Sequence, residues 1–231
     1  MKKLKLGELG WLLGILLCSL GVHFSARSGF GVSMVVAPAY VLSRFLSGIS
    51  SFFSFGNTEY CFQGLLLLLL IAVLCRFKWK YLGCFVTSVL YGLALDGWNA
   101  LLGSSVYETM TMRIVGMVLG AIITALAISF YLHAYLPQQV YELVVKEVTE
   151  RFSLKLTVVK WVYDISSLAL GILLMLLLFG RFDLGMIGIG TLLLTVINTP
   201  LIAMWGKLLD KFCDFSPAFP RFHEWFEKYL D

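Results

Sequence analysis

The sequence predicts an all-α membrane protein with six transmembrane helices, arranged as two inverted three-helix repeats that each contain a short interfacial or re-entrant segment. The first observation is composition: 59% of the 231 residues are hydrophobic and 14% are charged, whereas a soluble domain usually carries about 25% charged residues. The second is a set of six apolar stretches, since roughly 20 apolar residues are needed to cross a bilayer as a helix. The third is a recurrence of similar residues about 105 positions apart.

The predicted spans follow one another with short polar connections. They cover about residues 8–26, 59–76, 80–102, 113–135, 158–179 and 185–205. The first begins after Lys2, Lys3 and Lys5 and is similar to the apolar part of a signal peptide. Because several more spans follow it, we expect an uncleaved first transmembrane helix.

Two shorter segments lie between the spans, and each contains or follows a proline. Residues 35–46 include Pro38, and residues 138–152 follow Pro137. Both segments are too short or too polar to cross the bilayer. The second has the pattern of an interfacial helix, with one apolar and one charged side. The apolar side is predicted to hold Val140, Leu143, Val144 and Val148, and the charged side Glu142, Lys146 and Glu150.

The repeat divides the chain into parts. Matched pairs include Gly10 with Gly116, Gly14 with Gly120, Glu59 with Asp164, and Arg76 with Arg181. The predicted parts are a first transmembrane repeat at 1–106, a second and inverted repeat at 107–205, and a cytoplasmic amphipathic tail at 206–231. An odd number of crossings in each unit places the second unit upside down relative to the first. Such inverted repeats recur in secondary transporters, whose sites lie between the halves near the middle of the membrane.

The distribution of positive charge predicts the orientation. Most of the 18 lysine and arginine residues fall on the side of the N-terminus. Those predicted on the opposite side are Arg27, Arg44, Arg113 and Arg181. Because cytoplasmic loops carry the excess of positive residues, we expect both termini to be cytoplasmic.

Several functional classes are disfavoured. The net charge of +4 is spread along the loops without a basic and aromatic stripe, so no nucleic acid partner is expected. The five cysteines lack metal-ligand spacing, so we expect neither a metal site nor a disulfide. The chain has no cofactor fingerprint, and no cofactor is expected. Ser33 invites comparison with intramembrane serine proteases, but His23 and His133 lie near helix ends, so we expect no enzyme.

Close helix packing is predicted where small residues recur every four positions. Gly10 and Gly14 in the first span match Gly116 and Gly120 in the fourth. Such residues let two helix backbones approach each other. We interpret them as one helix pair within the chain, and the alternative is a homodimer face.

Three carboxylates lie in the predicted spans, where an ionisable group costs about 2.5–3.5 kcal/mol and usually faces the interior of a bundle. Glu59 and Asp164 are related by the repeat and could reach one central cavity from opposite sides. Asp96 stands beside a glycine, and Asn198 stands near Pro200 in the sixth span. Paired helix breaks in two halves point to a transport site. The predicted site for substrate or protons is Glu59, Gln63, Asp96, Trp98, Asn99, Asp164 and Asn198.

Each acid also has a structural alternative. Glu59 begins its helix and is well placed against the helix dipole. Asp164 lies four residues after Lys160, on the same helix face, which favours a salt bridge near the surface. Asp96 is close to the outer end of its span, where it could be exposed.

Three segments resemble the YczE/YitT-like family of bacterial membrane proteins. They are a glycine-then-aspartate helix at 90–98, a GxGT stretch at 188–191, and small residues at 29–33 that lead to Pro38. The similarity covers about residues 8–205. It implies a compact multi-pass protein of the bacterial cytoplasmic (inner) membrane and brings no defined activity.

The chain departs from this family after its prolines. Relatives often have an acidic residue there, whereas Pro137 is followed by Gln138 and Gln139. The departure implies a different ligand, or a role that has moved to Glu59.

Two functional hypotheses follow. The first is a small secondary transporter or permease for an unidentified small molecule or ion, with carboxylates at the repeat interface that bind substrate or protons. It predicts a polar cavity between the repeats. The second is a non-transporting membrane adaptor or sensor that binds a partner through residues 138–152 and the tail. It predicts a closed core in which the acids are paired. Both place the chain in the lipid bilayer.

Overall fold

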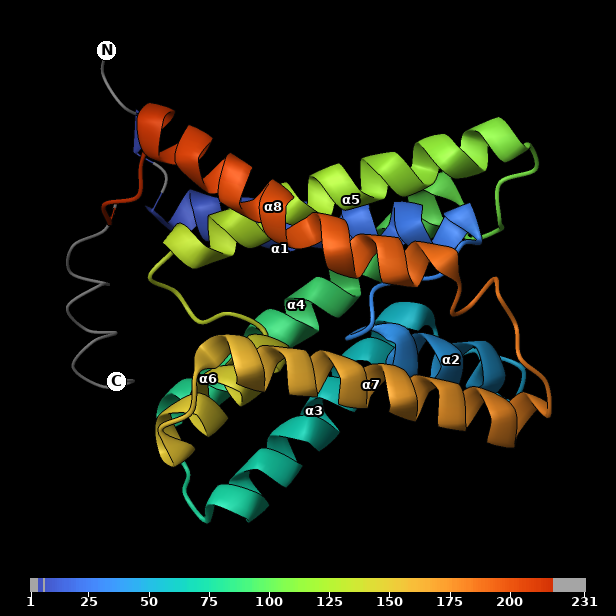
Figure 1. Ribbon diagram of the computed structural model, residues 1–231, viewed down its shortest axis with the longest axis horizontal. Coiled ribbons are helices and arrows are strands. Elements are labelled where there is room, and N and C mark those ends of the chain that lie inside the picture. Colours follow the sequence, from blue (N-terminus) through green and yellow to red (C-terminus); the bar gives the residue numbers. More distant parts are fainter. Residues whose placement is uncertain (1–3, 6, 218–231) are drawn as a thin grey trace.

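The computed structural model describes residues 4–5 and 7–217 of the chain. Its helices are α1 (Gly7–Ser28), α2 (Ala37–Leu46), α3 (Phe55–Leu74), α4 (Trp79–Leu102), α5 (Met110–His133), α6 (Val140–Phe152), α7 (Leu156–Phe179) and α8 (Ile189–Phe212). All except α2 and α6 are long and apolar enough to cross a membrane. The protein is therefore an all-α, multi-pass membrane protein, which confirms the predicted all-α membrane class and the six spans (Figure 1).

Length and capping explain where the spanning helices begin and end. They contain 20 to 24 residues, which at 1.5 Å per residue gives about 30–36 Å and matches a hydrocarbon core of about 30 Å. Apolar stretches become helices in lipid because every backbone N–H and C=O has to be bonded within the segment. Side-chain oxygens cap two of the starts: Ser54 accepts from the Asn57 amide at α3, and Thr109 accepts from the Met112 amide at α5.

The two short helices are held between the spanning helices. α2 packs against α3 and α7, while α6 packs against α3, α4 and α7. Val140 and Leu143 are buried as predicted, but Tyr141, Val145 and Glu147 are buried as well. Three helices contact α6, so its buried residues are not confined to the predicted apolar side.

α1 and α5 form the most extensive helix contact. A Cβ added to Gly120 would lie 2.8 Å from the Gly21 carbonyl oxygen and 2.3 Å from Ser25 Oγ, so only glycine fits there. The predicted pairing of the first and fourth spans is confirmed, although the backbones approach most closely at Gly21 rather than at Gly10 or Gly14. These glycines serve contacts within the chain, so they do not form a homodimer face.

The two ends of the described chain meet. Strand β1 (Leu4–Lys5) pairs in parallel with strand β2 (Cys213–Asp214). Since six spanning helices lie between them, both ends are on the same side of the bundle. α8 continues to Phe212 and so includes the first residues of the predicted tail at 206–231. Residues 218–231 of that tail lie outside the described residues.

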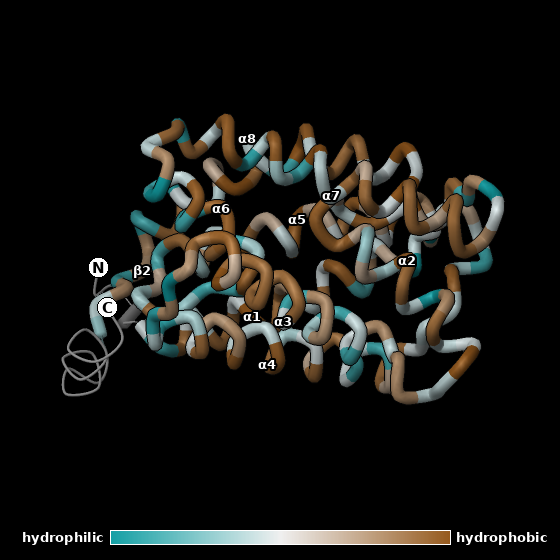
Figure 2. The backbone as a smooth tube through the Cα atoms, turned by 90° about the horizontal axis from the view of Figure 1, so that it is seen from below, coloured by the Kyte–Doolittle hydropathy of each residue, from teal (hydrophilic) through white to brown (hydrophobic). Residues whose placement is uncertain are grey.

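The last two spanning helices of each half are arranged differently. α3 packs along α4, whereas no comparable packing joins α7 to α8. α8 instead packs on α5 and runs along one edge of the molecule, and the spanning helices are mostly hydrophobic along their length (Figure 2).

The predicted helix breaks are absent. α4 is continuous through Asp96, and α8 is continuous through Pro200. A proline removes only one backbone donor, and in lipid no water competes for the remaining helix bonds. The glycine, aspartate and proline residues therefore do not mark unwound segments.

Candidate functional site

A polar cluster lies inside the bundle where α3, α4 and the start of α6 meet. We call it the Glu59 cluster, and it consists of Glu59, Gln63, Ser88, Gln139 and Tyr141. All of these residues are buried, and Glu59, Gln63 and Ser88 are 0% exposed. Glu59 and Gln63 share one face of α3 because they are four residues apart. The sequence predicted these two residues as part of one site, and the structure places them together.

Gln63 holds the start of α6. Its Oε1 accepts hydrogen bonds from Ser88 Oγ at 2.5 Å and from the Val140 amide at 3.2 Å. Its Nε2 donates to Gln139 Oε1 at 3.1 Å. The first amides of a helix have no partner inside the helix. The side chains of α3 and α4 therefore determine where α6 begins.

Glu59 has one bonded and one unbonded carboxyl oxygen. Oε1 accepts from the Tyr141 hydroxyl at 2.8 Å and from Gln63 Nε2 at 3.4 Å. Oε2 is buried and has no hydrogen-bond partner among the described residues. An ionised carboxylate away from water is costly unless it is paired. The free oxygen is therefore the position where a proton or a cationic group would bind.

Asp96 has a structural role at the start of α3. The Gly56 amide donates to Asp96 Oδ1 at 2.8 Å, and the Ser54 hydroxyl donates to Asp96 Oδ2. Both carboxyl oxygens are therefore occupied by the first turn of α3. Asp96 links α4 to α3 and is not part of the Glu59 cluster.

Trp98 and Asn99 connect α4 to α1. Trp98 Nε1 donates to Ser19 Oγ at 3.1 Å. His23 Nδ1 and Asn99 Oδ1 are 2.8 Å apart. These contacts use the polar atoms that the sequence assigned to substrate binding, and they hold α4 against α1.

Asp164 and Asn198 lie in the second half of the chain. Asp164 Oδ2 is 3.5 Å from Lys160 Nζ, as the structural alternative predicted, and Asp164 Oδ1 is buried without a partner among the described residues. The ring of the neighbouring Tyr163 lies 6.5 Å from the ring of Tyr141, so α7 reaches the edge of the Glu59 cluster. Asn198 Oδ1 on α8 is likewise buried and unpartnered there.

Sequence reasoning missed Ser88, Gln139 and Tyr141. Gln139 was visible as the second glutamine after Pro137, but only its contact with Gln63 reveals its place. Glu142, which follows Tyr141 in the first turn of α6, was assigned to the charged side of that helix. Burial raises the pKa of Glu142 against the opposing effect of nearby Lys160, and its Oε2 has no partner among the described residues.

Two pockets flank α6. One, of about 190 Å³, is lined by Leu74, Arg76, Lys78, Glu147, Glu150 and Arg151. The other, of about 170 Å³, lies between α4, α6 and the segment before α6, and Glu142 and Gln138 are among its lining residues. Neither pocket is lined by Glu59. The Glu59 cluster is thus closed to these pockets in this conformation.

Comparison with known proteins identifies a family whose function is unknown. The model of a family of unknown function, DUF6198, matches residues 7–207. The match covers every spanning helix of the described chain except the last turn of α8. No curated protein and no solved structure matches the chain.

Proposed function

The chain belongs to DUF6198, and we propose that it is a small secondary transporter or permease in which Glu59 binds a proton or the cationic group of a substrate. The observation that carries this proposal is the fully buried Glu59 carboxyl group with an unpartnered Oε2. Ionisable groups at membrane depth are expensive and commonly mark ion or substrate pathways. A purely structural glutamate would have both oxygens occupied, as Asp96 has.

The surroundings of Glu59 support a switch between two charge states. When Glu59 carries a proton, the buried group is neutral and needs no counter-ion. When the proton leaves, the Tyr141 hydroxyl and Gln63 amide still donate to Oε1, and a cationic group can pair with Oε2. Exchange of a proton for a cationic substrate group at one carboxylate couples the movement of the proton to the movement of the substrate.

α6 gives this exchange a route to the surface. Glu142 follows Tyr141 in α6 and lines the pocket of about 170 Å³ beside Lys80 and Lys146. A small movement of α6 would open this pocket toward Tyr141 and Glu59. The proposal therefore treats the structure as an occluded state, with α6 as the barrier.

An adaptor or sensor is the second candidate, favoured by the closed core. Glu59 accepts from Tyr141, Asp96 accepts from Ser54, and Asp164 pairs with Lys160. A chain that only holds a partner needs no open cavity. However, α6, which the sequence offered as the docking surface, is packed against α3, α4 and α7.

The remaining sequence predictions are also part of the proposal. They include the inverted relation of the two repeats, the bacterial inner membrane with cytoplasmic termini, and the finer likeness to the YczE/YitT-like proteins. The order of long and short helices supports the repeat, since α1 to α4 and α5 to α8 each read long, short, long, long. We include no enzymatic activity: the sequence offers Ser33 as a nucleophile, and the hydrogen bonds of His23 and His133 within the described residues go to Asn99, Ser129 and Asp210 instead.

The test starts with ligand-induced stabilisation of the purified protein in detergent. The melting temperature is measured against a metabolite panel at two pH values, for the parent and for Glu59→Gln. A ligand at 100 times its dissociation constant adds about 2.7 kcal/mol of stability. Glutamine retains an oxygen that can accept from Tyr141, so the fold is expected to persist while the cationic ligand is lost.

Flux in proteoliposomes then separates the two candidates. A compound that stabilises the parent is expected to cross the membrane with the parent and to fail with Glu59→Gln. Asp96→Asn is the matched control, since its carboxylate serves α3, and it is expected to keep transport. Equal flux with parent and Glu59→Gln, or no stabilising compound together with co-purification of a stoichiometric partner, would reject the transport proposal.

A further inference from the structure

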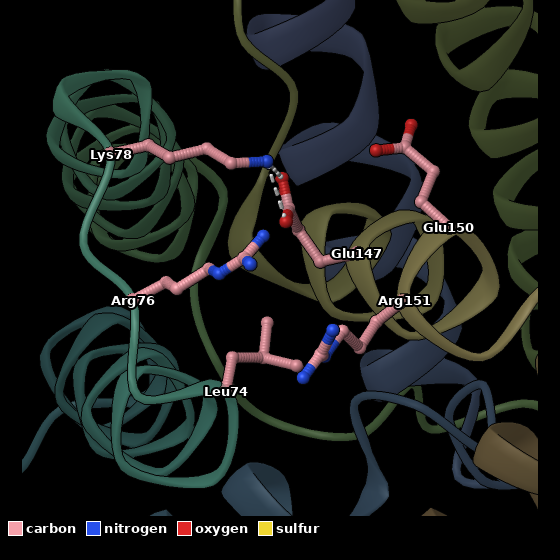
Figure 3. Close-up of a pocket in the computed structure, with 6 residues that line it drawn as sticks. All are labelled: Leu74, Arg76, Lys78, Glu147, Glu150 and Arg151. Carbon is pink, nitrogen blue, oxygen red and sulfur yellow. Dashed lines mark hydrogen bonds and ion pairs between the residues drawn. The ribbon is translucent and has the colours of Figure 1, made fainter.

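A second site, unrelated to Glu59, lies where the turn between α3 and α4 meets the last turn of α6. Cys75 ends α3 in a left-handed conformation with φ of 49°. The chain then turns and presents Arg76 and Lys78 toward α6, where they face Glu147 and Arg151 across the pocket of about 190 Å³ (Figure 3). Pockets for drug-sized molecules are larger, about 300–1,000 Å³, so this one suits a small group.

One of the two acidic residues that line this pocket, Glu147, is already engaged. Glu147 accepts from Lys78 Nζ at 2.9 Å on each oxygen and from the Tyr81 hydroxyl at 2.9 Å. Lys80 Nζ lies 3.9 Å from the same carboxylate. Burial alone would raise the pKa of Glu147, but hydrogen bonds from Lys78 and Tyr81 and the positive charges of Lys78 and Lys80 outweigh it and hold the pKa below its usual value. Glu147 thus neutralises lysine charge and fixes the wall of the pocket.

Two guanidinium groups remain without an acidic partner. Arg76 and Arg151 form no ion pair or side-chain hydrogen bond with the described residues. Both reach into the space between α3 and α6, and the Glu150 carboxylate points away from them (Figure 3). Two planar guanidinium groups, one from the turn after α3 and one from α6, can both reach the oxygens of one phosphate group. Arginine binds such oxygens through paired hydrogen bonds.

The pocket lies where the lipid-facing surface ends. Leu74, the last residue of α3, forms one wall. Nearby Val73 is 70% exposed, and Trp79 at the start of α4 is 63% exposed. Aromatic side chains gather at the boundary between hydrocarbon and water. The two arginines are therefore at the depth of lipid headgroups.

We propose that this pocket binds a phosphate group of an anionic ligand, with Arg76 and Arg151 as the donors. The phosphate can belong to an anionic lipid headgroup or to a soluble phosphate ester, since the guanidinium chemistry is the same for both. Basic pockets at the membrane surface between helices are a recurring place for anionic headgroups. The site is independent of the transport proposal, since it shares no residue with the Glu59 cluster.

The experiment measures the melting temperature of the full chain in detergent during titration with four probes. These are dioctanoyl phosphatidylglycerol, dioctanoyl phosphatidylcholine, glycerol 3-phosphate and inorganic phosphate. Phosphatidylglycerol is expected to stabilise the protein with saturation, and phosphatidylcholine is not, because its own cation neutralises the phosphate. Each of Arg76→Gln and Arg151→Gln should weaken the apparent affinity about fivefold, and the double variant about thirtyfold.

Arg181→Gln is the matched control, since Arg181 is an exposed arginine just after α7 and lines neither pocket. Its affinity should equal that of the parent. Stabilisation by phosphatidylglycerol alone assigns the site to a lipid headgroup, and equal stabilisation by glycerol 3-phosphate assigns it to a soluble ester.

The proposal is overturned if none of phosphatidylglycerol, glycerol 3-phosphate and inorganic phosphate stabilises the protein with saturation. It is also overturned if phosphatidylcholine binds as well as phosphatidylglycerol, or if the double variant binds as the parent does. Arg76→Lys and Arg151→Lys cover the case in which the glutamine variants do not fold. They keep the charge and lose the planar fork, so they should remain folded and bind more weakly.

Discussion

The two halves of the chain join their last two spanning helices in different ways. In the first half, a Cβ added to Gly92 of α4 would lie 2.6 Å from the Gly56 carbonyl oxygen of α3, so the backbones are in contact. In the second half, no comparable packing joins α7 to α8. About 105 residues after Gly56 and Gly92 stand Trp161 and Ile197, which are 49% and 41% exposed. Small residues close one pair, and large lipid-facing residues leave the other apart.

This difference shows which part of the molecule is fixed. The Glu59 cluster is built on α3, α4 and the start of α6, and the glycine contact and Asp96 hold α3 to α4. α8 is attached mainly through α5, so it can change position without breaking a hydrogen bond of the cluster. In the proposed transporter, α8 would be a part that moves against the fixed pair of α3 and α4 during alternating access.

The largest expected effect comes from opening the close pair. Gly92→Leu places a side chain against the Gly56 carbonyl, and overpacking of this kind should lower the free energy of unfolding by about 3 kcal/mol. Gly97→Ala on the same helix is the control, because nothing lies within 4 Å of a Cβ there, and it should be neutral or slightly stabilising. Thermal unfolding in detergent measures both. A Gly92→Leu protein as stable as the parent would contradict the described contact.

The next effect compares the two repeat-related acids. Glu59→Leu leaves the buried Tyr141 hydroxyl without an acceptor, which should cost about 1–3 kcal/mol. Asp164→Leu removes only a contact with Lys160, whose side chain is 58% exposed, so the change in stability should be within about 0.5 kcal/mol. Unfolding temperatures of the two variants provide the measurement. Equal losses of stability in the two variants would mean that both halves bury their acids equally. That result would contradict the difference between the two halves.

A smaller effect is expected from the polar residues of α4 and α8. Asp96→Ala removes the acceptor for the Gly56 amide and should cost about 1 kcal/mol, as for the loss of a helix cap. Asn198→Ala on α8 removes a side chain whose Oδ1 has no partner among the described residues, so it should be neutral. Hydrogen exchange of the first amides of α3 gives a local measurement. Unchanged protection in Asp96→Ala would show that Ser54 alone holds the start of α3.

The sequence predicted the spans well and the contacts poorly, for a physical reason. Apolar length is a local property, so the six spanning helices could be located from the sequence. The pairing of Asp164 with Lys160 could be predicted as well, because it depends on helix periodicity. The start of α6 depends on Gln63 and Ser88, which are distant in the chain from Val140, and no local pattern reports such a contact.

Asp96 illustrates the same limit. Its place beside a glycine was interpreted as a helix break at a binding site. The structure shows that no described residue packs on the adjacent Gly97, that Gly92 one turn earlier allows α3 to approach, and that the carboxylate accepts from the Gly56 amide in the first turn of α3. The residue types were informative about function or packing, but only the partner helix distinguishes between the two.

The smallest predicted effects concern two acids of α6 and have opposite signs. The pKa of Glu147 is held below its ordinary value of 4.5, so its stabilising contribution is present above that value and is lost as the pH falls through the lower folded-state pKa. The pKa of Glu142 is raised, mainly by burial. The folded state therefore binds that proton more tightly than the unfolded state, and Glu142 lowers stability as the pH rises above 4.5.

Glu147→Gln is accordingly expected to lower the free energy of unfolding by about 1 kcal/mol or less at neutral pH. Below pH 4.5 this variant should lose less stability than the parent does. Glu142→Gln is expected to gain stability at neutral pH and to match the parent in acid. The melting temperature of the three proteins between pH 3 and 8, in one detergent, tests both signs. If both variants change the stability in the same direction at neutral pH, then either the lysines do not stabilise ionised Glu147 or burial does not destabilise ionised Glu142.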